Sequence, residues 1–80
     1  MSPEQVRAAR GWLGWSQKDL ADKSHVSLST IKDFESGARK PIANNLGAIK
    51  QALEAEGFHF ACDETGHPTG ISKRGVSARH

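Results

Sequence analysis

Apolar side chains recur every three or four residues in four segments of the chain, the spacing that places them on one face of a helix. Glycines and short polar residues separate the segments, as at helix ends. The predicted fold class is therefore all-α, with four helices. They cover about residues 3–13, 17–24, 28–36 and 45–56, and their inward-facing residues include Val6, Ala9, Leu13, Leu20, Ala21, Ile31, Phe34, Leu46, Ile49 and Leu53.

The ends of these segments carry residues typical of helix caps. Ser2 with Gln5, and Ser16 with Asp19, have the spacing at which a hydroxyl and a longer polar side chain cap each other's main-chain N–H groups. Serine and asparagine also precede the last two helices, and glycine follows three of the four. The remaining expected caps are Ser27 for the third helix and Asn44 or Asn45 for the fourth, and the expected stops are Gly14, Gly37 and Gly57.

From residue 58 the apolar pattern changes from the period of a helix to that of a strand. Phe58 and Phe60 alternate with other residues, and turn-forming residues that include Gly70 follow and break the chain. The pattern predicts a short C-terminal β-strand or hairpin, and residues 72–80 would be a second weak strand or a frayed basic tail. We therefore divide the chain into a helical domain, residues 1–57, and a C-terminal β element with a basic tail, residues 58–80.

The aromatic face that Phe58 and Phe60 form admits two roles. It could cover the helical core of the same chain, or it could pair with a second subunit. Eighty residues with 36% hydrophobic content bury only a small core, so a partner subunit would add stability. The hypothesis favoured by the sequence is a homodimer with Phe58 and Phe60 at the contact.

The second and third predicted helices form a unit with a tight turn between them. Such a unit, carried by a scaffold of two further helices, is the geometry that lets a helix enter the DNA major groove. Small or apolar residues stand where the two helices approach each other, at Ala21 and Val26.

With these features the chain resembles the phage-repressor-like (Xre/Cro-type) helix-turn-helix family, in a short subgroup with a C-terminal strand. The resemblance covers roughly residues 3–57 and implies a repressor-like transcriptional regulator from a bacterium or mobile element. The residues that carry it are Leu13-Gly14-Trp15-Ser16-Gln17, Leu20-Ala21, Val26-Ser27, Thr30-Ile31, Phe34-Glu35-Ser36-Gly37, Arg39-Lys40-Pro41, Leu46 and Ile49.

The resemblance implies roles for particular residues on double-stranded operator DNA. Gln17, at the start of the second helix, would bind a phosphate together with the main-chain N–H groups there. The third helix would lie in the major groove. Leu28, Ser29, Thr30 and Asp33 would face base edges. Lys32, Ser36, Arg39 and Lys40 would lie near phosphates, and a solvated charged loop is an equally good explanation for this second set.

Two opposite charges fall on buried helix faces. Arg10 lies within the apolar stripe of the first helix, and Glu35 lies within that of the third. The resemblance pairs a first-helix arginine with a third-helix glutamate, and mutual neutralisation explains why both charges are tolerated. We expect a structural salt bridge between Arg10 and Glu35.

The sequence departs from the family pattern in two places. His25 stands where glycine is usual, at a turn position with positive φ. The outward side of the third helix lacks the Arg, Lys, Asn and Gln residues that make the strongest base contacts, so each subunit would read DNA weakly. Specificity would then need a dimer on paired half-sites or recognition of DNA shape.

The charge balance keeps a second function open. Residues 1–57 hold eight Lys or Arg against seven Asp or Glu, which is little positive charge for a DNA-binding domain. With Leu28 at the tip of the outward helix, the domain could instead bind a transcription factor, as an antiactivator or antirepressor does.

Other classes of function have little support in the sequence. We expect no enzymatic activity and no cofactor, because neither a phosphate-binding glycine loop nor a nucleophile with its base is evident. His59, Cys62, Asp63 and His67 have suitable donor atoms, but their spacing matches no zinc module, so no metal site is expected. One cysteine, no signal peptide and no long apolar run indicate a cytoplasmic protein without a membrane span.

Overall fold

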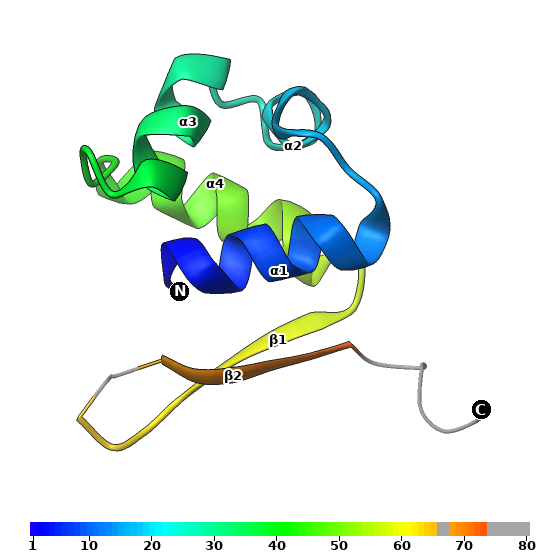
Figure 1. Ribbon diagram of the computed structural model, residues 1–80, viewed down its shortest axis with the longest axis vertical. Coiled ribbons are helices and arrows are strands. Elements are labelled where there is room, and N and C mark those ends of the chain that lie inside the picture. Colours follow the sequence, from blue (N-terminus) through cyan, green and yellow to red (C-terminus); the bar gives the residue numbers. More distant parts are fainter. Residues whose placement is uncertain (66–67, 74–80) are drawn as a thin grey trace.

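The computed structural model describes residues 1–65 and 68–73 and contains four helices followed by a two-stranded antiparallel hairpin. In Figure 1, α2 and α3 lie above α1 and α4, and the hairpin lies below these two helices. The elements are α1 (Pro3–Leu13), α2 (Gln17–Ser24), α3 (Leu28–Ser36), α4 (Ala43–Glu54), β1 (Phe58–Cys62) and β2 (Pro68–Lys73).

The first three helices have the ends that the sequence predicts. Ser2 and Gln5 form a reciprocal capping box on α1, as do Ser16 and Asp19 on α2, and the Ser27 hydroxyl accepts from the main-chain N–H of Thr30 on α3. Gly14 and Gly37 end α1 and α3 at φ values of 71° and 79°, which glycine adopts without steric cost. These caps satisfy N–H and C=O groups that the helices leave unpaired.

The fourth helix differs from the prediction at both ends. It begins at Ala43, and neither Asn44 nor Asn45 caps it, because the extended residue Ile42 already accepts the first helical hydrogen bond through its main-chain oxygen. Ile42 makes no side-chain cap. Regular helix ends at Glu54, two residues earlier than expected, and the chain then turns through Gly57, whose φ is 95°.

The C-terminal element is a hairpin, so the label all-α is incomplete. Phe58 pairs with Lys73 and Phe60 with Ile71, and a bulge lies between Ala61 and Cys62. The second strand begins at Pro68 and passes through Gly70, where the sequence predicted a chain break. The part of the predicted basic tail that spans residues 74–80 lies outside the described residues.

The hairpin covers the helical core of its own chain. β1 contacts α4, β2 contacts α1, and Phe58 is only 4% exposed. The edge of Trp12 packs on the Phe58 ring, with centroids 5.4 Å apart. Phe58 and the half-buried Phe60 thus take the first of the two roles that the sequence left open, because they cover the core of their own chain. Phe58 is buried in its own chain, whereas part of Phe60 stays exposed, and the dimer contact itself stays a prediction.

One buried side chain fixes the hairpin to the first helix. Gln5 Nε2 donates hydrogen bonds to the main-chain oxygens of Ala61, at 3.0 Å, and Gly70, at 2.6 Å. Its Oε1 accepts from the Ser2 main-chain N–H, so the same amide caps α1 and holds both strands. Since Gln5 is buried, each of these bonds satisfies a group shielded from water.

Candidate nucleic-acid interface

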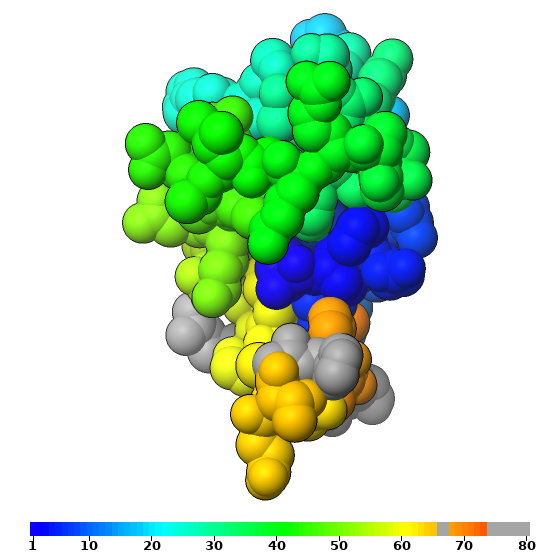
Figure 2. Space-filling view, turned by 90° about the vertical axis from the view of Figure 1, so that its left-hand side faces the viewer, coloured from blue at the N-terminus to red at the C-terminus, as the bar shows by residue number. Residues whose placement is uncertain are grey.

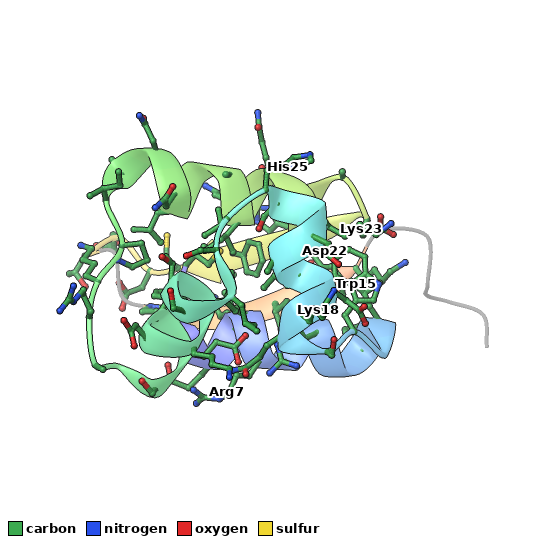
Figure 3. All side chains as sticks on the ribbon, turned by 90° about the horizontal axis from the view of Figure 1, so that it is seen from above. Arg7, Trp15, Lys18, Asp22, Lys23 and His25 are labelled. Carbon is green, nitrogen blue, oxygen red and sulfur yellow. The ribbon has the colours of Figure 1, made fainter. Side chains whose placement is uncertain are left out.

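The α2–α3 unit is a helix, a tight turn and a second helix. The turn begins at His25, whose φ of 58° is left-handed, and continues through Val26, which is buried. Ala21 and Ile31 are also buried where the two helices meet. Seen from above, His25 lies at the carboxyl end of α2, and Trp15 lies beside Lys23, whose ammonium is 5.8 Å from the Trp15 ring centroid (Figure 3).

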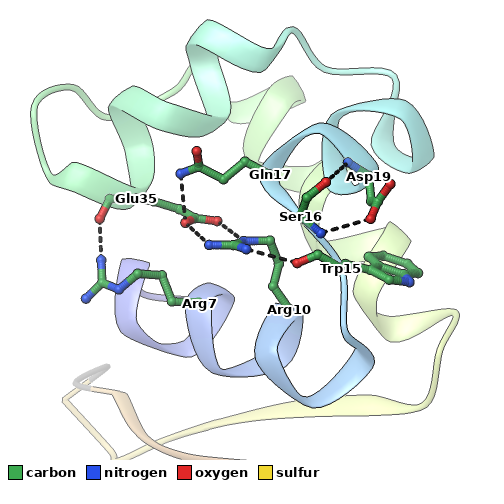
Figure 4. Close-up of polar contacts among 7 residues, drawn as sticks. All are labelled: Arg7, Arg10, Trp15, Ser16, Gln17, Asp19 and Glu35. Carbon is green, nitrogen blue, oxygen red and sulfur yellow. Dashed lines mark hydrogen bonds and ion pairs between the residues drawn. The ribbon is translucent and has the colours of Figure 1, made fainter.

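Glu35 on α3 holds an ion pair with Arg10 on α1 (Figure 4). Arg10 Nε donates to one carboxylate oxygen at 2.7 Å and Nη2 to the other at 2.6 Å, the bidentate geometry that arginine favours. Arg10 Nη1 also donates to the main-chain oxygen of Trp15 at 3.0 Å. The hydrogen bonds to Glu35 raise the pKa of the Arg10 guanidinium above its usual value, against the opposing effect of burial.

Two further side chains reach Glu35. Gln17, the first residue of α2, donates from Nε2 to the Glu35 carboxylate at 3.1 Å, and Arg7 donates to the Glu35 main-chain oxygen. Glu35 thus ties α3 to both α1 and α2. The Gln17 amide carries two N–H groups, and the bond to Glu35 uses one of them.

These contacts leave the opposite side of α3 toward solvent. Ser29, Lys32 and Ser36 are exposed, whereas Leu28, Thr30 and Asp33 are half-buried. Leu28 packs partly against the core. The Thr30 hydroxyl accepts from the Ser27 hydroxyl at 2.8 Å, which leaves its own proton free to donate elsewhere.

The loop after α3 places two cations beside this face. Arg39 and Lys40 are exposed and line the same shallow hollow as Ser29, Thr30 and Asp33. The loop is held to α3 because the Asp33 main-chain oxygen accepts from the N–H groups of Ala38 and Arg39. In Figure 2 the loop and the first turn of α4, in green, lie next to the blue-green residues of α3. Of the residues predicted to meet DNA, all but Gln17 lie on α3 and this adjoining loop.

The sequence analysis gave one residue a different role from the one it has in the structure, Asn45, and gave no role to another, Arg7. Asn45, which was expected to cap α4, lines the hollow beside α3 because the helix starts two residues before it. Arg7 contacts Glu35, and its position one turn from Arg10 on the same helix was the signal that could have identified it.

The described residues show no metal centre. Among residues 1–65 and 68–73 no three His, Cys, Asp or Glu side chains are grouped so that they could hold an ion, and Cys62 is exposed. His67, one of the four candidates, lies outside the described residues. In the same part of the chain, no helix has the length and apolar character needed to cross a membrane.

We compared the sequence with models of known protein families. A family model described as Helix-turn-helix matches residues 6–57, which is more than half of the chain and spans α2, the turn, α3 and α4 together with most of α1. No curated protein matches the chain.

Proposed function

Because this chain belongs to the helix-turn-helix family of DNA-binding regulators, we propose that it is a sequence-specific, repressor-like transcriptional regulator that inserts α3 into the DNA major groove. An α-helix with its side chains is about 10–12 Å in diameter, which suits a major groove about 12 Å wide. Repression would follow from occupancy of a promoter in the cytoplasm, where we expect the protein to act.

The observation that carries this proposal is the way Glu35 fixes α3. Its contacts with Arg10, Gln17 and Arg7 lie on the inner side of the helix, so the polar outer side stays free and is held at a fixed angle. A recognition helix needs this rigidity because its side chains must meet base edges within hydrogen-bond distance.

Phosphate contacts are proposed for two regions that flank α3. Arg39 and Lys40 lie in the loop beyond its carboxyl end, and Gln17 lies at the amino end of α2, where unpaired N–H groups and the helix dipole favour an anion. The second N–H of the Gln17 amide remains available while the first is bound to Glu35. Lys32 and Ser36, exposed on α3 itself, complete this set.

A second copy of the chain on a paired half-site is part of the proposal. The base-facing side of α3 offers mainly hydroxyl groups and one carboxylate, so one subunit supplies little discrimination between sequences. Two subunits bound to half-sites about 34–36 Å apart would together discriminate between sequences more strongly than one subunit does. Their contact would use surface other than the buried Phe58; Trp12, which is 49% exposed, is a large apolar side chain available for it.

The test is selection of bound sequences from random duplex DNA, followed by titration of the enriched site at several salt concentrations. We expect an inverted repeat and binding that weakens steeply with salt. Arg39→Ala and Lys40→Ala should each lower the affinity and reduce the salt slope by about one, whereas Lys50→Ala, on exposed α4 surface, should leave both unchanged. If no sequence is enriched, DNA binding is rejected in favour of a protein partner such as a transcription factor.

A further inference from the structure

A hollow of about 240 Å³ lies between the outer side of α3 and the loop that leads to α4. Asp33 lines it from α3, and Arg39 and Lys40 line it from the loop. It therefore brings one carboxylate and two cations together on the surface proposed to meet DNA. The sign and place of these charges restrict which part of DNA can contact each of them.

The backbone of Asp33 is held while its carboxylate is free. The main-chain oxygen accepts from the Ser36 hydroxyl and from the N–H groups of Ala38 and Arg39. Among the described residues, none of the ion pairs or side-chain hydrogen bonds involves the Asp33 carboxylate. Since Asp33 is half-buried, this carboxylate is partly shielded from water and has no donor among the described residues.

DNA offers few donors that a carboxylate can use in the major groove. Phosphates repel it, and guanine and thymine present acceptor oxygens there. Adenine sets the N6 amino group beside the acceptor N7, for which a carboxylate has no proton. Cytosine presents its N4 amino group without an adjacent acceptor on the same base, so it is the base that suits Asp33.

We propose that Asp33 selects cytosine at one position of each half-site by accepting a hydrogen bond from the N4 amino group. Arg39 and Lys40, on the other side of the hollow, bind the phosphates of the same segment and offset the repulsion between those phosphates and the carboxylate. This inference rests on the proposed function, because it assigns a base to a site on the proposed recognition helix.

The experiment compares sequences selected from random duplex DNA by the full chain and by three variants. The wild-type protein should prefer cytosine by about tenfold or more at one position, the discrimination expected of a charge-assisted base contact. Asp33→Asn should change that preference to adenine, because an amide both accepts from N6 and donates to N7. Asp33→Ala should bring the preference at that position to within about twofold.

The matched control is Glu56→Gln, which removes the same charge from an exposed residue beyond the far end of α4. It should leave the cytosine preference intact, which separates base recognition from a general gain in DNA affinity. If the wild-type protein and Asp33→Asn enrich the same base at every position, the role of Asp33 is overturned while DNA binding stands. If the wild-type protein enriches no sequence, both the proposed function and this assignment fail.

Discussion

Gln5 Nε2 lies 2.6 Å from the main-chain oxygen of Gly70 and donates a hydrogen bond to it across 65 positions of sequence. The same nitrogen donates to Ala61 on the neighbouring strand. Because Oε1 of this amide also caps α1, one side chain joins the first helix to both strands of the hairpin. The hairpin and the four helices therefore form one packed unit.

Gln5→Glu keeps the size of the side chain and its capping oxygen but replaces the donor with a second acceptor. That oxygen would face the main-chain oxygens of Ala61 and Gly70, so the free energy of unfolding should fall by about 1–3 kcal/mol or more. Urea unfolding at neutral pH measures this loss of stability. Hydrogen exchange of the variant should show faster opening of β1 and β2 than of α3. Gln51→Glu, the same change at an exposed site on α4, is the control and should have little effect.

Arg10→Met should destabilise the fold by about 3–5 kcal/mol, because the Glu35 carboxylate, 3% exposed, would lose its counterion. Glu35→Leu should cost less, since the Arg10 side chain is 18% exposed and keeps its bond to Trp15. The double variant Arg10→Met/Glu35→Leu should be more stable than Arg10→Met alone. Thermal and urea unfolding of the four proteins give the coupling energy, and additive losses would show that the pair is not coupled.

His25→Gly should stabilise the domain by about 1 kcal/mol, because glycine adopts the left-handed conformation of this turn without steric cost. The opposite change, Gly37→Ala at φ 79°, should destabilise by a similar amount although no neighbouring atom obstructs the added methyl group. Midpoints of thermal unfolding measure both. Equal stability of His25→Gly and the wild-type protein would mean that the turn carries no strain.

Hydrogen bonds from the Ser16 main chain and hydroxyl hold the pKa of the Asp19 carboxyl below its usual value of about 3.9. A lowered pKa in the folded state stabilises the fold at pH values above about 3.9, and this contribution is lost as the pH falls through the folded value. The free energy of unfolding should therefore drop more steeply between about pH 5 and pH 3 in the wild-type protein than in Asp19→Asn. Parallel pH curves for the two proteins would contradict this expectation.

The sequence by itself determined the features of this protein that depend on near neighbours. The caps at Ser2, Ser16 and Ser27 and the stop at Gly37 join residues three or four positions apart, so the local pattern specifies them. The helices follow from the periodic placement of apolar residues for the same reason. The predicted start of α4 was wrong because the extended main chain at Ile42 begins this helix and no side chain caps it.

Only the tertiary structure decided which distant groups meet. The acceptors of Gln5 lie 56 and 65 positions away, and the burial of Phe58 depends on α1 and α4 packing over it. Each of these contacts depends on the relative position of packed elements, because side-chain interactions act over a few ångströms whatever the separation in sequence. A linear pattern states which side chains face inward but not which ones they will touch.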